Sequence, residues 1–307
     1  MKKKVIIFLI IILGIFLASW VIKPENLREI KEKVRNIFFE NQTTSSYNAK
    51  SLILVDLSND ESFISKNADE KQVPASLAKL FVIEYATTFT NLNDIVTAKS
   101  EAIALTKEGS SVANIKAKKY YLKDLFAAML VPSGNDAAYV VADYCGGILS
   151  PTSSSSKERI NIFMENLNIY IKDEGYTGTI LHDPSGFDTE ATTTVADLKK
   201  VTKKLLGHKW FRNIVAKSTY TANLPDGSKQ TWKSTNTFLD SSSEYYNKNV
   251  IGVKTGSLAD DYNLVVLYKA HGKEFLICSL GSESDTSRYD DVSYIIKTID
   301  ESDYLKK

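Results

Sequence analysis

The chain has 307 residues, of which 43% are hydrophobic and 24% charged, and its formal net charge is +1. This composition is typical of a globular protein with a sizeable core, and it excludes the strongly basic character of a nucleic-acid-binding domain. The two cysteines, Cys145 and Cys278, and the three histidines lack the spacing of a zinc site, so we predict no metal and no cofactor. We interpret both cysteines as buried free thiols, and the sequence leaves a disulfide open.

The first 22 residues have the pattern of a membrane anchor. Three lysines at positions 2 to 4 precede an uninterrupted apolar run over residues 5–22. Those 18 residues, at ~1.5 Å each, would form a helix about 27 Å long, just enough to cross a bilayer core. A cleaved signal has a shorter apolar region and a small-x-small site, which Trp20 interrupts here. We therefore expect an uncleaved single-pass helix in the cell membrane, with the rest of the chain outside the cytoplasm. A cleaved and secreted form is the alternative.

Residues 23–46 predict a stem and linker, because apolar side chains recur there at helical spacing before a polar run from residue 41 to 46. The globular domain is expected over residues 47–307. Its first segment predicts a hairpin, with one strand over residues 51–57, a turn at Asn59 and Asp60, and a second strand through Ser65.

Helical patterns occupy the middle of the chain. They begin at Ser76, recur over residues 122–130, 160–171 and 194–206, and include a helix that Cys145 closes before Gly146 and Gly147. Thr194 and Asp197 are the expected start of the helix over residues 194–206. Residues 153–156 are interpreted as a serine-rich surface loop. Strands return over residues 250–253, 264–268 and 275–280, and residues 292–299 predict a closing helix. Strands at both ends with helices between them predict an α+β fold, with a mostly antiparallel sheet whose outer strands come from opposite ends of the chain and a flanking helical region.

Ser76 and Lys79 form the candidate nucleophile and base. A serine hydroxyl needs a neighbour to accept its proton, and none of the three histidines has an obvious triad context. Residues three apart on a helix share a face, so an amine at Lys79 can reach a hydroxyl at Ser76. Burial and the positive end of the helix would both favour a neutral amine, which can act as a base.

The serine–lysine spacing alone is a weak signal, because Ser154 and Lys157 match it as well. Ser-x-Asn occurs four times, whereas Lys254-Thr255-Gly256 occurs once. The informative feature is an ordered set in which Ser133-Gly134-Asn135 lies in a turn between two predicted helices. Lys254 is placed near the end of a strand, before a glycine that lets a ligand approach the backbone.

These motifs resemble those of the serine D-alanyl-D-alanine carboxypeptidases, the low-mass penicillin-binding proteins related to class A β-lactamases. The resemblance covers roughly residues 47–299. It extends to residues 129–138 around Ser133-Gly134-Asn135 and to residues 252–256 around Lys254-Thr255-Gly256. Two further segments match as well, residues 183–188 with 194–197 and residues 284–289.

The resemblance implies a β-lactamase/transpeptidase-like fold and a role for each matched residue. Ser76 would attack the carbonyl between two terminal D-alanines to form an acyl-enzyme, and Lys79 would accept its proton. Ser133 would relay a proton to the leaving amine, and Asn135 would hold Lys79 and bind the peptide. Lys254, Thr255 and Arg288 would bind the terminal carboxylate. The residue after Gly256 is Ser257, and the backbone N–H groups of Ser257 and Ser76 would form the oxyanion hole. The implied partners are peptidoglycan stem peptides that end in D-Ala-D-Ala, and β-lactams as covalent inhibitors.

Two departures and three rivals accompany this interpretation. Ser185 stands where many relatives have histidine, so Asp183 and Ser185 are interpreted as a structural turn. The family's β-rich C-terminal domain and amphipathic C-terminal anchor are not expected here, and the N-terminal segment would replace that anchor. The rivals are a β-lactamase, a peptidoglycan endopeptidase of the same fold and a non-catalytic cell-wall-binding protein. The glutamates between the second and third motifs lack the context of a β-lactamase deacylation base: Glu158, Glu165, Glu174, Glu190 and Glu244.

Overall fold

The computed structural model describes residues 47–302. Contacts divide the chain into two units, Met1–Ser46 and Tyr47–Lys307. The predicted membrane anchor and stem fall in the first unit, which lies outside the described residues. Within residues 47–302, no helix is both long enough and apolar enough to span a bilayer.

An antiparallel five-stranded sheet forms the centre of the described part, in the order β2-β1-β9-β8-β7. One edge strand comes from the N-terminal side and the other from the C-terminal half, so the predicted sheet is confirmed. The hairpin formed by β8 and β9 is longer than predicted, because the polar residues at the ends of both strands continue the pairing. The strands are β1 (Ser51–Asp56), β2 (Glu61–Lys66), β7 (Val250–Leu258), β8 (Asp261–Ala270) and β9 (Lys273–Ser282).

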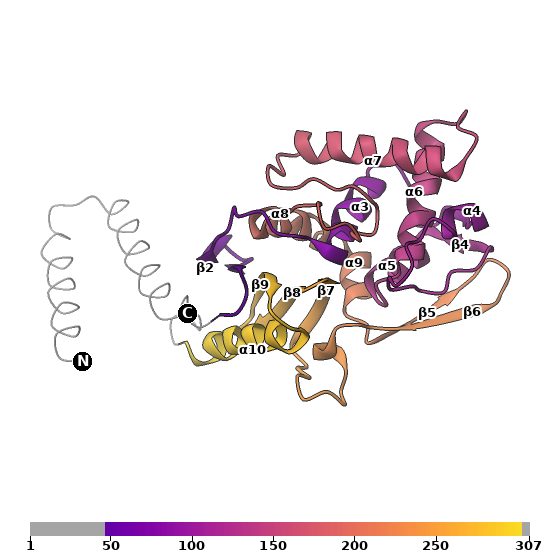
Figure 1. The fold of residues 1–307 in the computed structure, drawn as a ribbon. Helices are drawn as coiled ribbons and strands as arrows, with labels where there is room; N and C mark the ends of the chain where they lie inside the picture. Colours follow the sequence, from indigo (N-terminus) through magenta and orange to yellow (C-terminus); the bar gives the residue numbers. More distant parts are fainter. Residues whose placement is uncertain (1–46, 303–307) are drawn as a thin grey trace, which may run out of the picture. The chain divides into compact units, whose positions relative to one another are not determined.

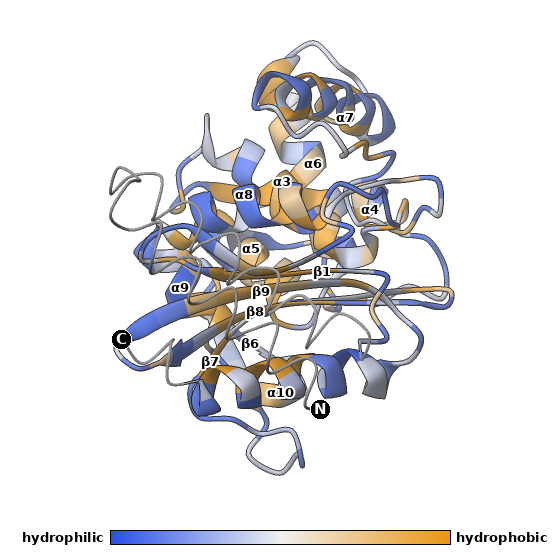
Figure 2. Ribbon diagram, turned by 90° about the vertical axis from the view of Figure 1, so that its left-hand side faces the viewer, coloured by the Kyte–Doolittle hydropathy of each residue, from blue (hydrophilic) through white to orange (hydrophobic). Residues whose placement is uncertain are grey.

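Helices cover both faces of this sheet (Figure 2). On one face lies α10 (Asp285–Glu301), and on the other lie α8 (Val195–Leu206) and the helical region (Figure 1). Side chains alternate between the two faces of a strand, and β8 shows this directly. Leu264 and Val266 pack in the cluster with α10, whereas Val265 and Leu267 pack in the larger cluster with the helices.

The helical region surrounds α3 (Ala78–Thr87), whose residues from Ala78 to Ala86 are all buried. Two short antiparallel ribbons and two 3-10 turns complete it, and the sequence predicted neither ribbon. The remaining elements are η1 (Ala75–Leu77), β3 (Ile95–Thr97), α4 (Ser100–Ile103), β4 (Lys119–Tyr121), α5 (Leu122–Leu130), α6 (Asn135–Leu149), α7 (Ser156–Asp173), α9 (Lys209–Val215), β5 (Thr219–Asn223), β6 (Lys229–Lys233) and η2 (Thr237–Leu239).

One helix end differs from its prediction. Helix α6 does not stop at Cys145 but continues through both glycines to Leu149. A Cβ at Gly146 would lie 1.9 Å from the carbonyl oxygen of Arg159 on α7. Gly146 is therefore a point of close helix packing and not a helix terminator. Cys145 and Cys278 are buried and free, as interpreted, and burial raises the pKa of both thiols.

The serine-rich patch also differs in part. Helix α7 begins at Ser156, and the Ser155 hydroxyl accepts the N–H of Glu158. The Glu158 carboxylate in turn accepts the N–H of Ser154. These two bonds cap the first turn of α7, so the last two serines of the patch start a helix. Thr194 and Asp197 form the predicted helix start of α8, because the Thr194 hydroxyl accepts the Asp197 N–H.

Candidate active site

Ser76 lies in the 3-10 turn η1, immediately before helix α3. Pro74 precedes the turn, and Ala75 has a φ of 46°, a left-handed value that is strained for a residue with a side chain. Ser76 itself is half-buried, whereas Ala75 and Leu77 on either side are buried. The turn therefore presents the Ser76 hydroxyl at the surface of the core.

Lys79 lies one turn further on, and its side chain is fully buried. Its Nζ is 2.8 Å from Ser76 Oγ, 2.7 Å from Asn135 Oδ1 and 2.8 Å from the carbonyl oxygen of Ser185. Burial lowers the pKa of Lys79 to about 7, against the opposing effect of the negative charges of Asp183 and Asp136. Near neutral pH the amine is therefore available as a proton acceptor 2.8 Å from the hydroxyl.

Ser133 and Asn135 come from the connection between α5 and α6, as predicted. Ser133 has a φ of 64°, and Gly134 leaves no room for a Cβ, which would lie 2.5 Å from Cβ of Ala113. Both carboxylate oxygens of Asp136 accept backbone N–H groups, those of Ala113 and Ile115 at 2.8 Å. The turn is thus fixed against the loop before β4, and it places Asn135 Oδ1 beside Lys79.

Lys254 lies in the middle of edge strand β7, not near its end as predicted, because the strand continues to Leu258. Its buried Nζ is 2.8 Å from Ser133 Oγ and donates to the carbonyl of Thr255 at 2.8 Å. Burial first, and then the positive charges of Lys79 and Arg288, lower the pKa of Lys254 well below its ordinary value. A second serine–lysine pair therefore faces the first.

The residues after Lys254 continue along β7 beside the turn that carries Ser76. Thr255 is buried and its hydroxyl lies 2.6 Å from that of Thr235, while Ser257 is exposed. A Cβ at Gly256 would lie 3.0 Å from the carbonyl oxygen of Pro74. Because a larger residue would push strand β7 away from η1, Gly256 keeps Ser257 next to the turn that carries Ser76.

Arg288, at the start of α10, lies behind this strand. Its Nη1 donates to the carbonyl of Gly256 and to Ser257 Oγ at 3.0 Å each, and its Nη2 pairs with Asp285. The side chain is buried, and its Nε has no partner among the described residues. Arg288 therefore supports the backbone of β7 at Gly256 and brings a fixed positive charge to the site.

The loop of Asp183 and Ser185 has a larger part in the site than a structural turn. One Asp183 oxygen accepts the N–H groups of Ser185, Gly186 and Phe187 and the Ser185 hydroxyl, which aims the Ser185 carbonyl at Lys79. A Cβ at Gly186 would lie 1.9 Å from the Ala75 carbonyl oxygen. The Asp-Pro-Ser-Gly segment was the signal in the sequence. The contact of the Ser185 carbonyl with Lys79 involves a backbone atom, so no side-chain pattern could predict it.

Asn263 on β8 received no role from the sequence, yet it connects three parts of the site. Its buried side chain donates to the carbonyls of Val73 and Pro74 at 2.9 and 3.0 Å and accepts the N–H of Gly281 at 2.8 Å. Its own carbonyl accepts Arg288 Nη1 at 3.2 Å. The one available signal in the sequence was an amide residue directly before the apolar run over residues 264–268.

Among residues 47–302, no carboxylate is placed at this site as the base of a β-lactamase would be. The described hydrogen-bond partners of Lys79 Nζ are Ser76, Asn135 and Ser185, and none is a glutamate. Both oxygens of Asp136 are occupied by backbone N–H groups, and Asp183 holds its own loop. The glutamates considered in the sequence make no described contact with Ser76 or Lys79.

Comparisons with known proteins agree with this geometry. A family model for D-alanyl-D-alanine carboxypeptidase matches residues 38–282. A D-alanyl-D-alanine carboxypeptidase of Streptomyces sp. strain K15 is 29% identical over 244 residues, which cover 76% of this chain and 80% of that protein. The D-alanyl-D-alanine carboxypeptidase DacC of Escherichia coli K12 is 29% identical over 261 residues, 80% of this chain and 60% of DacC. The crystal structure of the Streptomyces K15 DD-transpeptidase matches with a TM-score of 0.72 at 26% identity, covering 82% of this chain and 97% of that one.

Proposed function

This chain belongs to the D-alanyl-D-alanine carboxypeptidase family, and on that premise we propose that it removes the terminal D-alanine of peptidoglycan stem pentapeptides through an acyl-enzyme on Ser76. The observation that carries the proposal is the position of Lys79 Nζ, buried and 2.8 Å from Ser76 Oγ. A lysine with a pKa of about 7 is a competent base at neutral pH, so the serine has what it needs to attack a carbonyl.

In the first step, Ser76 Oγ attacks the carbonyl carbon of the penultimate D-alanine while Lys79 accepts the hydroxyl proton. The negative charge that develops on the carbonyl oxygen is met by the backbone N–H groups of Ser76 and Ser257. Support for this oxyanion hole comes from the packing of Gly256 against Pro74, which brings the two backbone segments together. Asn135, which is hydrogen-bonded to Lys79, supports the amine and offers its amide to the substrate peptide.

The leaving D-alanine requires a proton and a place for its carboxylate. Ser133 lies 2.8 Å from Lys254 Nζ and would relay to the leaving nitrogen the proton that Lys79 took from Ser76, which leaves Lys79 neutral again. Lys254 and Thr255 would bind the carboxylate, and Arg288 would add its positive charge from behind the strand. A bound carboxylate would also raise the pKa of Lys254, because it offsets the burial and the cations that lower that pKa in the free site.

Water then attacks the acyl-enzyme, Lys79 accepts a proton from this water and returns it to Ser76 Oγ, and the shortened peptide leaves with the new carboxylate. A β-lactam would acylate Ser76 by the same first step and hydrolyse slowly, because the site has no glutamate contact to Lys79 in the described residues to drive water onto the ester. Slow turnover distinguishes this enzyme from the β-lactamase alternative.

The direct test is mass spectrometry of a stem pentapeptide before and after incubation with the enzyme. Loss of one alanine is the expected result. Recovery of the intact pentapeptide, together with no covalent capture of a fluorescent penicillin, would instead support a non-catalytic wall-binding protein. Rapid hydrolysis of a chromogenic cephalosporin would favour the β-lactamase alternative.

We place the enzyme outside the cytoplasm, attached to the cell membrane by residues 1–22. The support is the charge and hydropathy pattern of that segment and the location of the substrate, which belongs to the cell wall. Treatment of intact cells with protease, followed by immunoblotting of membranes, tests this arrangement. Protection of the catalytic domain would contradict it.

A further inference from the structure

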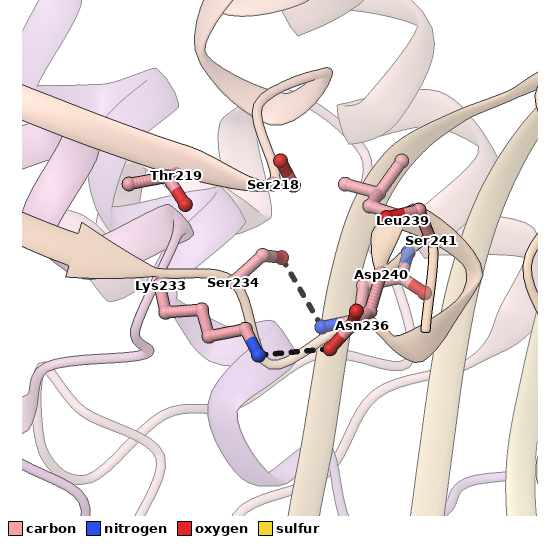
Figure 3. Close-up of a pocket in the computed structure, with 8 residues that line it drawn as sticks. All are labelled: Ser218, Thr219, Lys233, Ser234, Asn236, Leu239, Asp240 and Ser241. Atoms are coloured by element: carbon pink, nitrogen blue, oxygen red, sulfur yellow. Dashed lines mark hydrogen bonds and ion pairs between the residues drawn. The ribbon is translucent and has the colours of Figure 1, made fainter. Parts of the chain in front are cut away.

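The lysine–aspartate pairs of this protein differ in how far water screens them. Lys233 and Asp240 line a polar pocket at the base of the β5–β6 ribbon, where Lys233 Nζ lies 2.8 Å from Asp240 Oδ2 (Figure 3). Lys233 is exposed, so such a pair contributes little. Lys107 instead faces a buried carboxylate, because its Nζ lies 3.6 Å from Oδ2 of Asp183, whose side chain is 8% exposed. A buried charge is screened less by water, so the charge of Lys107 acts strongly on Asp183.

Lys107 also joins two segments of the candidate active site. It lies in the connection between α4 and β4, as does Ser111, whose carbonyl accepts the Asn135 N–H at 2.8 Å. The Lys107 Nζ donates to the carbonyl of Phe187 at 2.8 Å. Phe187 belongs to the loop that Asp183 organises. Lys107 therefore holds that loop against the segment to which the second motif is bonded.

The two oxygens of Asp183 have different partners. Oδ1 accepts the N–H groups of Ser185 and Gly186 at 2.7 and 2.9 Å, which directs the Ser185 carbonyl at Lys79. Oδ2 is buried and has no hydrogen-bond partner among the described residues, so the ammonium of Lys107 is left to offset its charge. Burial lowers the pKa of Lys79, and the negative charge of Asp183 opposes this effect. A cation beside Asp183 limits that opposition.

Lys79 has charged neighbours on several elements. Asp183 lies in the loop before α8, Asp136 lies on α6, and Lys254 lies on β7. Both oxygens of Asp136 accept backbone N–H groups from the connection that carries Lys107. Of these two anions, only Asp183 has a lysine within ion-pair distance among residues 47–302. Asp183 is therefore the anion whose effect on Lys79 depends on another side chain.

The other titratable groups near Asp183 do not compensate its charge. Burial first, and then the charges of Asp183 and Asp188, raise the pKa of Tyr139 on α6, so this phenol is neutral. The His182 imidazole lies 3.2 Å from Asp188, and Lys107 Nζ lies 3.9 Å from the other oxygen of that carboxylate. Within the described part of the chain, Lys107 is thus the cation that faces Asp183 itself.

We propose that Lys107 is a positioning residue of this site, which holds the loop of Asp183 in place and offsets its charge, so that Lys79 is free to accept a proton. This inference rests on the proposed function, in which Lys79 is the base, and adds a residue that acts on the base through Asp183. Loss of the Lys107 charge leaves the Asp183 carboxylate uncompensated, which favours the protonated form of Lys79. Acylation of Ser76 then requires a higher pH.

The experiment measures the rate of acylation by a chromogenic β-lactam as a function of pH. Lys107→Gln should move the midpoint of the profile upward by about 0.5–1 pH unit and lower the rate at pH 7 by about two- to fivefold. Lys107→Arg keeps the charge and should restore the wild-type midpoint. The matched control is Lys200→Gln, since Lys200 is also exposed, donates to the Gly175 carbonyl at 2.8 Å and lies 3.8 Å from the buried Asp197. Asp197 is not among the charges that act on Lys79, so this control should leave the midpoint unchanged.

A double variant tests whether the effect passes through Asp183. Asp183→Asn keeps an oxygen acceptor for the N–H groups of the loop and removes the charge, so it should move the midpoint downward. In this background Lys107→Gln should shift the midpoint clearly less than in the wild type, because the charge that Lys107 offsets is gone. An equal shift in both backgrounds would overturn the action through Asp183.

A second readout separates this inference from the proposed function. NMR of the protein with isotope-labelled lysine gives the pKa of Lys79, and Lys79→Arg identifies its signal. A pKa that rises in Lys107→Gln, in a protein that releases no alanine from a pentapeptide, supports the role of Lys107 and overturns the carboxypeptidase activity. Alanine release together with an unmoved midpoint in Lys107→Gln, even if the plateau is lower, overturns the role of Lys107 and leaves the proposed function standing.

Discussion

Two serine–lysine pairs face each other in this protein, and they are built in different ways. Ser76 and Lys79 are three residues apart on one turn, whereas Ser133 and Lys254 are 121 residues apart and meet across the cleft, although the Nζ–Oγ distance is 2.8 Å in both. Negative charges oppose the effect of burial at Lys79 and hold its pKa at about 7. At Lys254 the neighbouring charges are positive and act with burial.

This difference assigns different chemistry to the two lysines. Lys79 is poised to exchange a proton near neutral pH, as a general base must. Lys254 lies in a buried, cationic neighbourhood in which no carboxylate of residues 47–302 pairs with it, and a substrate carboxylate would supply the missing anion. The comparison therefore predicts that changes at the first pair affect chemistry, and that changes at the second affect recognition of a charged substrate.

The largest expected effect is that of Ser76→Ala. Removal of the nucleophile should lower kcat by on the order of 10⁶-fold, as for other serine enzymes, and should abolish covalent labelling by fluorescent penicillin. Gel fluorescence after incubation measures the labelling, and Ser154→Ala is the matched control, because Ser154 has the same spacing to a lysine outside the site. Persistent labelling of the Ser76 variant would show that Ser76 is not the nucleophile.

Lys79→Arg should have the next largest effect. An arginine stays charged at any relevant pH and cannot accept the Ser76 proton, so the acylation rate should fall by about 10²–10⁴-fold. Stopped-flow acylation by a chromogenic β-lactam measures this rate. Lys254→Arg, which keeps a cation at the other pair, should lose less; an equal loss in the two variants would mean that both lysines serve the same purpose.

Lys254→Gln should mainly affect substrates with a free terminal carboxylate. Loss of a charge-assisted hydrogen bond of about 1.5–3 kcal/mol corresponds to a decrease of about 10- to 150-fold in kcat/KM. The same variant should discriminate poorly between a free and an amidated C-terminus, which the wild type should distinguish. A wild type that cleaves both peptides equally well would contradict the role of Lys254 in recognition.

The pH dependence of kcat/KM tests the first pair without a mutation. Lys79 must be neutral to act as a base, and its pKa is lowered to about 7, so the rate should rise with pH and level off above pH 7. At pH 6 only about one molecule in ten has the neutral amine, which predicts a rate about tenfold below the plateau. A rate that falls as the pH rises from 6 to 8 would exclude Lys79 as the base.

Asn263→Asp should have the smallest of these effects, because Asn263 acts through the turn that carries Ser76. The variant keeps an acceptor for Gly281 but loses the donor to the carbonyls of Val73 and Pro74. We expect the free energy of unfolding to fall by about 1–3 kcal/mol and acylation to slow by about tenfold. The pH midpoint should not move, since Lys79 keeps its described partners.

Urea denaturation and stopped-flow acylation measure these two quantities. The control is Asn166→Asp, which removes an amide donor to the Ile162 carbonyl on α7, away from the described partners of Ser76 and Lys79. Loss of stability without slower acylation would reduce Asn263 to a purely structural residue. A shift of the pH midpoint would mean that it acts on Lys79 instead.

The sequence by itself determined the local parts of this protein. The 51–57 hairpin strand, the helix at residues 122–130, the capped start of α8 and the turn around Ser133 were all predicted, because each depends on side chains a few residues apart. The pair of Ser76 and Lys79 belongs to this group, since a single helical turn fixes its geometry. So does the centre of strand β8, which was predicted from the apolar run over residues 264–268.

Only the tertiary structure decided how these parts meet. The Ser133–Lys254 contact, the Ser185 carbonyl on Lys79 and the bonds from Asn263 join segments far apart in the chain, and no local pattern contains them. Gly146 and Gly186 read as breakers or turn residues in the sequence, but their lack of a Cβ permits close contact with another segment. The pKa of Lys79 belongs to the same class, because burial and distant carboxylates set it, and both exist only when the chain is folded.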